Sequence, residues 1–449
     1  MTRPARPARL IALALARAML AGPPSTAGLA ARMRRCLGDV AAPWIPPLAA
    51  RCAALPHLQW LRLEARGLAT LIERDEGFTK ATTAGAESPP YVRHYLLREA
   101  APMALPPLAL RTCALPAWPH TGALAAGLAL TPAGLWRLTR PAAWQRRTPL
   151  GEQHYRSHLL RKRSGGWRLL EAPEPYLKAV QRRLLATLLD AIPPHEAACG
   201  YVRGRSVLDH ARAHQGQAVL LRFDLRDFFA SVRAARVHAL FAALGYPQTV
   251  ARDLTALCTV ATPEPVLLRL RAEGGLSFEQ AQKLRDPHLP QGAPSSPALA
   301  NLCAFGLDLR LQGLATSLGA KYTRYADDLV FSGPASLRAA AARIEAWVGR
   351  IAREEGFALN HRKSRCLPAS QRQSACGVVV NERTNLPRDE FDRLKAVLHN
   401  CVRLGPASQN RDGRADWRAH LQGRIGWAAQ LNPTKAERLQ RLFSRIDWN

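Results

Sequence analysis

The chain has 449 residues, of which 47% are hydrophobic and 22% are charged; this length suits two or three folded domains, and this composition excludes a fully disordered chain. Lysine and arginine total 63 residues against 34 acidic residues, so the formal net charge is +29. A surplus of this size favours a polyanionic partner such as nucleic acid. Arginine-rich codon usage explains the preference for arginine over lysine, but it does not explain why so few acidic residues balance the basic ones.

The cysteines and the apolar runs narrow the class of protein further. The nine cysteines are scattered and form no Cys-x-x-Cys pair, so we expect reduced thiols and neither a zinc module nor a disulfide framework. Residues 10–16 form an apolar run after a basic start, but Arg17 interrupts it, which predicts an amphipathic helix in place of a secretion signal. No apolar run reaches the length of a membrane span, so we expect no membrane association and a cytoplasmic location.

Three segments of different composition follow one another along the chain. Residues 1–118 are rich in Ala, Leu, Arg and Pro and predict a basic helical extension without a recognisable catalytic motif. Residues 119–381 alternate helical and β-like runs, and residues 382–449 are helical again. Residues 1–150 contain 19 basic and 7 acidic residues, so the positive charge is spread along the chain and does not form a single tail.

Two apolar runs in the middle segment end in acidic residues. The run 219–223 leads into Asp224, and Asp327 and Asp328 lie between two short apolar arms, as in a β-hairpin. Neighbouring side chains of a strand point to opposite faces, so both acids reach one point only in a tight turn. Three acids at strand ends are suitable ligands for two Mg²⁺ ions. The alternative is that the doublet is a surface turn and Asp224 a helix cap.

The order of three motifs favours the first interpretation. The stretches RFDLRDFF at residues 222–229, LPQGAPSSP at 289–297 and YADD at 325–328 resemble motifs A, B and C of reverse transcriptases. Residues 161–168, 200–206 and 356–363 agree with the same family, so the resemblance covers about residues 119–449. It implies an α+β right-hand polymerase fold: fingers and a palm with an antiparallel sheet in 119–381, a helical thumb in 382–449, and the N-terminal helical extension in 1–118.

Details of the motifs resemble the retron branch of this family. Residues 291–297 (QGAPSSP) are similar to the retron motif, whereas group II intron enzymes tend to have Gly-Gly after the Gln. His210-Ala211-Arg212-Ala213-His214 stands where retron enzymes have Asn-Ala-x-x-His, so a histidine replaces the asparagine. Residues 375–377 (ACG) match only the glycine of the retron Val-Thr-Gly element. Residues 423–427 (GRIGW), followed by an Asn-Pro pair, resemble the retron-type thumb.

The retron resemblance implies partners that composition and spacing do not reveal. It implies a structured noncoding RNA that is both template and primer, dNTP substrates, a branched RNA–DNA product, and a role in phage defence with an effector protein. The N-terminal extension would then contact this RNA, dock the effector or form a structural layer over the fingers. One alternative is a defence or abortive-infection-type reverse transcriptase without a retron RNA. Another is a catalytically idle RNA-binding scaffold, which the intact set of three acids disfavours.

The resemblance also assigns roles to individual residues around the reacting phosphate. Asp224, Asp327 and Asp328 would bind two Mg²⁺ ions directly or through water. Arg168 and Lys162 would meet the triphosphate, because guanidinium and ammonium groups pair with phosphate oxygens. A solvated hairpin tip is the alternative interpretation for these two basic residues.

Further residues would contact the nucleotide itself. Gln291 would lie against the sugar, and Gly292 would let the backbone approach the pairing bases. Phe229 stands where the family has an aromatic steric gate that excludes a 2′-hydroxyl, and Phe228 beside it would face the core. Lys363 would protonate the leaving pyrophosphate or act only through its charge.

RNA contacts are expected upstream of the first catalytic acid. Arg203 and Arg205 lie in the stretch GYVRGRS, and His210 and His214 occupy the altered retron element. For the two histidines a structural role inside the fold is the alternative to an RNA contact.

Overall fold

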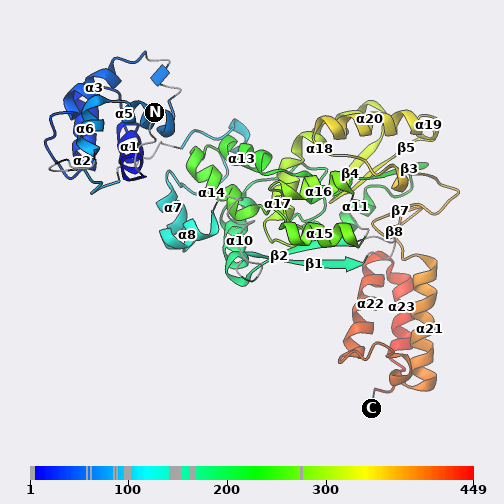
Figure 1. Cartoon of the computed structure of the whole chain (residues 1–449). Coiled ribbons are helices and arrows are strands. Elements are labelled where there is room, and N and C mark those ends of the chain that lie inside the picture. Colours follow the sequence, from blue (N-terminus) through cyan, green and yellow to red (C-terminus); the bar gives the residue numbers. More distant parts are fainter. Residues whose placement is uncertain are drawn as a thin grey trace. The chain divides into compact units, whose positions relative to one another are not determined.

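The structure is a computed structural model that describes residues 6–56, 59–60, 63–83, 86, 89–95, 103–140, 151, 153–161, 167–273 and 277–448. The chain divides into two compact units, Met1–Pro102 and Met103–Asn449 (Figure 1). Trp118 belongs to the second unit, where its ring lies 5.7 Å from that of Tyr246, and the Tyr246 hydroxyl donates a hydrogen bond of 2.9 Å to the Pro116 carbonyl. The N-terminal unit is therefore shorter than the extension predicted for residues 1–118.

The first unit is a small helical domain with its own core. Apolar side chains at helical spacing, such as Leu15 and Met19 or Leu29 and Met33, are fully buried. The second helix begins after Ser25, whose hydroxyl accepts a hydrogen bond of 3.2 Å from the Gly28 amide. The described helices are α1 (Arg6–Met19), α2 (Thr26–Cys36), α3 (Ile45–Ala53), α5 (Ala65–Glu73) and α6 (Glu76–Thr82). Helix α1 corresponds to the amphipathic helix predicted near the start.

A four-stranded antiparallel sheet lies at the centre of the second unit. Its order is β4 (Lys321–Tyr325), β5 (Asp328–Gly333), β3 (Val219–Asp224), β6 (Arg365–Pro368). Alternate residues of the strands contribute to two apolar cores. Leu221 and Phe331 share one with α18 (Phe305–Ser317) and α20 (Ala341–Glu354), and Leu220 and Val330 share the other with the C-terminal helices. The sheet confirms the predicted antiparallel palm.

The fingers begin with a two-stranded hairpin. Strands β1 (Tyr155–Arg161) and β2 (Trp167–Pro173) pair along their whole length, and α10 (Pro175–Thr187) follows. The buried Gln181 amide donates hydrogen bonds of 2.8 Å to the Tyr155 hydroxyl and to the Leu257 carbonyl, which fixes the base of the hairpin on the helices behind it. The other α-helices of the fingers and palm are α7 (Thr121–Gly127), α8 (Pro132–Leu138), α11 (Val207–Arg212), α12 (Phe228–Ser231), α13 (Ala234–Ala243), α14 (Gln248–Cys258), α15 (Glu264–Ala272), α16 (Phe278–Arg285), α17 (Ser296–Cys303) and α19 (Ser336–Ala339).

Short elements complete the second unit. Strands β7 (Ser374–Ala375) and β8 (Val378–Val379) pair as a separate hairpin. Single turns of 3₁₀-helix are η1 (Leu108–Leu110), η3 (Leu189–Ala191), η4 (His361–Lys363) and η5 (Pro406–Gln409).

The C-terminal helices form a three-helix thumb, shown in orange and red in Figure 1. They are α21 (Arg388–Leu404), α22 (Trp417–Leu431) and α23 (Pro433–Phe443). The Asn432 side chain caps α23 by accepting a hydrogen bond of 3.2 Å from the Lys435 amide, and Pro433 occupies the first turn. This cap explains the Asn-Pro pair of the sequence in structural terms. Across the described residues, no helix is both long enough and apolar enough to cross a lipid bilayer.

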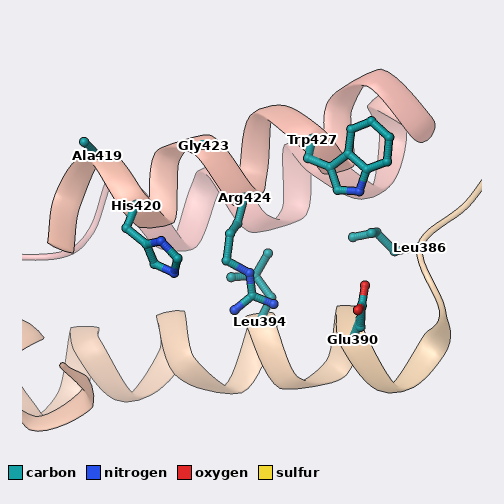
Figure 2. A pocket seen from close by; sticks show the side chains of 8 residues that line it. All are labelled: Leu386, Glu390, Leu394, Ala419, His420, Gly423, Arg424 and Trp427. Atoms are coloured by element: carbon teal, nitrogen blue, oxygen red, sulfur yellow. The ribbon is translucent and has the colours of Figure 1, made fainter. Parts of the chain in front are cut away.

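A pocket of about 360 Å³ lies in the thumb between α21 and α22 (Figure 2). His420 and Arg424 project from α22 toward α21, which carries Leu394 and Glu390, and the Trp427 ring lies at the end of the pocket near Leu386 (Figure 2). The remaining lining residues are Leu386, Ala419 and Gly423. The pocket therefore combines an indole ring and two basic side chains with an apolar floor and one carboxylate.

Candidate active site

The turn between β4 and β5 brings the acidic residues to one end of the sheet. Only Ala326 and Asp327 separate the two strands, and Ala326 has the left-handed backbone conformation, with φ of 56°. Asp328 lies directly opposite Asp224 in the β3–β5 ladder. The Leu225 amide donates a hydrogen bond of 2.9 Å to the Asp327 carbonyl. The doublet is thus part of a tight hairpin turn and lies beside the acid that ends β3.

The proximity of these acids affects the protonation of Asp327. Burial, followed by the negative charges of Asp224 and Asp328, raises the pKa of the Asp327 carboxyl. Asp224 itself is 5% exposed. The site therefore holds more negative charge than its own neighbours neutralise, which is typical of a cation-binding or catalytic centre.

Asp224 contacts one basic and one amide side chain. The Lys363 ammonium group lies 2.7 Å from Asp224 Oδ2, and Asn360 Nδ2 lies 3.3 Å from Oδ1. Both residues come from the segment around η4, whose Asn360 amide also bonds the Asp224 carbonyl at 2.8 Å. Lys363, expected near the leaving pyrophosphate, is therefore paired with the Asp224 carboxylate.

Asp328 is held by an arginine that sequence reasoning missed. Arg222 Nη2 lies 2.9 Å from Asp328 Oδ1 and 3.1 Å from Oδ2, a charge-assisted fork. Cys376 Sγ lies 3.5 Å from the same carboxylate. The signal that could have revealed Arg222 is its spacing, because it precedes Asp224 by two residues in a strand and so shares its face.

The donor set fits divalent cations by its chemistry. Carboxylate oxygens are the ligands that Mg²⁺ prefers, and the mutual repulsion that acts on Asp327 would be relieved by a cation. Within the described part of the chain, no three His, Cys, Asp or Glu side chains form a ready-made cage around one point. Asp224 and Asp328 are instead paired with Lys363 and Arg222. A cation would therefore have to compete with basic side chains of the protein.

Adjacent phenylalanines after β3 face different surroundings. Phe228 is 5% exposed and stacks on Phe357 with ring centroids 5.6 Å apart. Phe229 is partly buried, and its ring centroid lies 6.2 Å from that of Tyr201. This is the arrangement that the sequence predicts if Phe229 is the gate and Phe228 belongs to the core.

The loop before α17 lies against the fingers hairpin. The Glu171 amide of β2 donates a hydrogen bond of 2.9 Å to the Gln291 carbonyl. Gly292 has φ of 134°, and a Cβ there would lie 3.1 Å from the Glu171 carbonyl oxygen. Close packing on β2 thus requires this glycine, a reason that differs from the expected approach to bases. Arg168 is exposed on β2, and Lys162 lies outside the described residues.

A buried polar network supports the turn between β4 and β5, the proposed catalytic turn, from behind. The Arg324 side chain is fully buried and donates hydrogen bonds of 2.8 and 2.6 Å to Asp308 on α18. It also donates to Asn301 Oδ1 at 2.9 Å and to the Ala326 carbonyl at 3.1 Å. The Tyr322 hydroxyl bonds the same Asp308 at 2.8 Å. This second group, also missed from the sequence, fixes the turn to α17 and α18.

The two histidines expected to contact RNA also lie inside the fold, but on the other face of β4, because they bond Thr323, whose side chain alternates with those of Tyr322 and Arg324. His210 and His214 are fully buried, and both bond the Thr323 hydroxyl, at 2.6 and 2.7 Å. His214 also bonds the Ser332 hydroxyl at 2.7 Å. Burial is the main cause that lowers the pKa of His210 to about 4 and that of His214 to about 3. Because neither ring reaches the surface, these side chains do not form the expected RNA contacts. Both histidines instead have the structural role given as the alternative.

The two arginines of the upstream stretch remain near the surface. Arg203 is exposed, and Arg205 is exposed while its guanidinium bonds the backbone carbonyls of Glu196 and, at 3.3 Å, Ala198. Arg205 thus fastens its own loop, and only Arg203 of this pair keeps the position expected for an RNA contact.

The chain is similar to known proteins over this same region. Residues 160–379 match the family described as reverse transcriptase (RNA-dependent DNA polymerase). The chain is 43% identical over 296 residues to the Retron Mx65 reverse transcriptase of Myxococcus xanthus, a match that covers 64% of each chain. It is 30% identical over 282 residues to the Retron Ec86 reverse transcriptase of Escherichia coli, covering 62% of this chain and 77% of the relative.

A second Myxococcus relative and one solved structure also match the chain. The match to the Retron Mx162 reverse transcriptase of Myxococcus xanthus has 36% identity and covers 59% of that protein, so this chain spans less than two thirds of either Myxococcus relative. Among solved structures, a foamy viral protease-reverse transcriptase in complex with double-stranded DNA has 17% identity and a TM-score of 0.37. It aligns with 66% of this chain and 41% of its own.

Proposed function

Because the chain belongs to the retron-type reverse transcriptase family, we propose that it is an RNA-directed DNA polymerase. The observation that carries this proposal is the convergence of Asp224, Asp327 and Asp328 at one end of the palm sheet. Burial and two neighbouring acids raise the pKa of the Asp327 carboxyl, which is unfavourable for folding but suits the binding of cations for phosphoryl transfer.

The pairing of the acids distinguishes their roles. A pair of divalent cations, for which Mg²⁺ is the proposed ion, would supply charge stabilisation to the attacking and leaving oxygens. Asp224 and Asp327 would hold them directly, whereas Asp328, already held in the Arg222 fork, would bind through water. Before the cations bind, Lys363 neutralises the Asp224 carboxylate. Once they are bound, its ammonium group would be available to donate a proton to the leaving pyrophosphate.

The nucleotide would lie between the fingers hairpin and the palm. Arg168 and Lys162 would bind the triphosphate, and Phe229 would exclude a 2′-hydroxyl. Gln291 would contact the sugar from the loop that β2 holds through the Glu171 amide. These assignments rest on the family resemblance and on the proximity of β2, the loop before α17 and the catalytic turn.

We extend the proposal to a structured noncoding RNA as template and primer, with a branched RNA–DNA product and a role in phage defence with an effector. The retron names of the relatives and the net charge of +29 support it. The thumb pocket, with Trp427, Arg424 and His420, has the aromatic and basic composition that single-stranded nucleic acid favours. The N-terminal unit would add a further basic surface for this RNA.

Replacing the acids tests the polymerase activity. Asp224→Asn and Asp327→Asn should each lower primer extension on an RNA template by about a thousandfold or more, because the charge that holds the cation is lost. RNA affinity, measured on the same variants, should stay close to that of the wild type. The exposed Asp190 on η3 provides the matched control, and Asp190→Asn should extend normally. Robust synthesis by Asp327→Asn would overturn the polymerase assignment.

The nature of the RNA is tested separately. The protein, purified together with nucleic acid from its own host, should carry DNA joined to RNA through a 2′–5′ branch, which debranching treatment would release. A bound DNA without a branched RNA would favour a defence-type reverse transcriptase, and RNA alone with an inactive protein would favour a scaffold.

A further inference from the structure

Tyr201 has an unusual backbone and a rigid surrounding. Its φ is 60°, in the left-handed region that residues other than glycine rarely adopt, and its side chain is 55% exposed. The preceding Gly200 carbonyl accepts a hydrogen bond of 2.8 Å from Asn301 Nδ2. A Cβ at Gly200 would lie 2.7 Å from the Ala326 amide nitrogen, so only glycine fits there. Tyr201 is thereby fixed directly beside the catalytic turn.

The ring of Tyr201 completes an aromatic cluster at the acids. Its centroid lies 6.2 Å from that of Phe229 and 6.3 Å from that of Tyr325, within the range of favourable aromatic pairs. Burial and the charge of Asp327 raise the pKa of the Tyr201 phenol, while Arg168 acts in the opposite direction. The phenol thus lies in the electrostatic reach of both a catalytic acid and the arginine proposed for the triphosphate.

Exposure and strain together point to a ligand. An aromatic ring that is more than half exposed beside the half-buried Asp327 leaves apolar surface in water, and a left-handed non-glycine residue is strained, so it persists only where the surroundings enforce it. Sites that keep such a conformation are often sites of binding. The cluster offers the flat apolar surface that a sugar ring or base covers.

We propose that Tyr201 is a specificity-determining residue for the incoming nucleotide, holding the Phe229 ring in place and forming a second wall of the sugar site. This inference rests on the proposed polymerase function. The Phe229 ring has two aromatic neighbours: the core residue Phe228, with ring centroids 5.5 Å apart, and Tyr201, with ring centroids 6.2 Å apart. Without Tyr201 the gate ring gains rotational freedom, so its exclusion of a 2′-hydroxyl weakens.

The test uses variants that separate the ring from the backbone. Asparagine tolerates the left-handed conformation, so Tyr201→Asn removes the ring with little added strain, and Tyr201→Phe keeps the ring without the hydroxyl. Single-nucleotide incorporation on a primer–template should show KM for a dNTP raised about three- to tenfold in Tyr201→Asn, with the preference for dNTP over rNTP reduced by a similar factor. The maximal rate should change less than KM, and Tyr201→Phe should behave as the wild type.

Controls make each outcome decisive. Tyr176 on α10 is 48% exposed, and Tyr176→Asn should leave both KM and sugar preference unchanged. Wild-type sugar preference in Tyr201→Asn, or an equal loss in Tyr201→Phe, would overturn the proposal. If Tyr201→Asn does not fold, Tyr201→Gly provides the same comparison, because glycine adopts the left-handed conformation without strain. A wild-type protein that cannot extend a primer would instead refute the polymerase function, because every prediction for Tyr201 is a ratio to an active wild type.

Discussion

The polar groups on the two sides of the turn between β4 and β5, the proposed catalytic turn, differ in how far their charges are neutralised. Behind the turn, Arg324, Asp308 and Asn301 satisfy one another in a fully buried network. In front of it, Asp327 lies beside two further acids, and the charges of those acids contribute to raising its pKa. The same two-residue turn thus separates a region in which opposite charges are paired from a region in which neighbouring acids repel one another.

This difference shows how the fold keeps an unfavourable site in place. Acids that repel one another would move apart unless the backbone that bears them were fixed. The hydrogen bond from Arg324 to the Ala326 carbonyl, and the contact of Gly200 with the Ala326 amide, fix this backbone from the rear. The rear network therefore stabilises the geometry that the front requires, and each side can be altered without directly touching the other.

The largest effect is expected from breaking the rear pair. Arg324→Leu leaves Asp308 charged and buried without its partner, which should lower the free energy of unfolding by about 3–5 kcal/mol. Adding Asp308→Leu should restore most of this stability, yet primer extension should remain low because Ala326 has lost its anchor. Urea denaturation and extension assays on the single and double variants check both statements. Arg310→Leu, which alters a surface pair on the same helix, is the control and should change little. Full activity in the double variant would contradict the anchoring role.

A smaller effect on the free energy of unfolding is expected from the two buried histidines, and it depends on pH. The folded pKa values of about 4 for His210 and about 3 for His214 lie below the ordinary value of 6.5, so protons bind the unfolded chain first. The contribution of the two neutral histidines to the free energy of unfolding is therefore fully present above pH 6.5. It falls as the pH drops toward 4, by about 1.4 kcal/mol per pH unit for each histidine.

Denaturation at several pH values measures this slope. His214→Gln removes one titrating group and should reduce the slope by about half, whereas the exposed His399→Gln should leave it unchanged. An unchanged slope in His214→Gln would mean that His214 does not stay neutral in the folded protein.

The smallest effect concerns the front. Lys363→Met removes the positive charge from Asp224, so a divalent cation should bind about tenfold more tightly to the free protein. Mn²⁺ binding followed by electron paramagnetic resonance measures this without catalysis. The exposed Lys178→Met on α10 is the matched control. Equal Mn²⁺ affinity in Lys363→Met and wild type would exclude competition at Asp224.

Motif order predicted the palm, the tight turn and the burial of Phe228, because these depend on local pattern and strand period. Side-chain partners across strands depend on register, which the sequence does not state. Arg222 meets Asp328 only because Asp224 pairs with Asp328 in the ladder. Arg324 likewise finds its partner on α18, sixteen residues earlier, which no spacing rule gives.

Other differences have equally local causes. The boundary of the N-terminal unit shifted from 118 because the Pro116 carbonyl and the Trp118 ring contact Tyr246, a contact between residues far apart in the chain. His210 and His214 are one helical turn apart on α11 and its end, and this spacing suits a buried face as well as an exposed one. Composition alone does not decide between these faces.

Glu171 gives the fingers hairpin a mechanical property. Its amide bonds the Gln291 carbonyl, and its carboxylate bonds the Thr262 hydroxyl at 2.7 Å and His288 Nε2 at 3.1 Å. Strand β2 is thereby tied at one point to the whole segment that leads into α17. A displacement of β2 at Glu171 would carry Gln291 with it, so the hairpin proposed to reach the triphosphate and the loop proposed to meet the sugar would shift together.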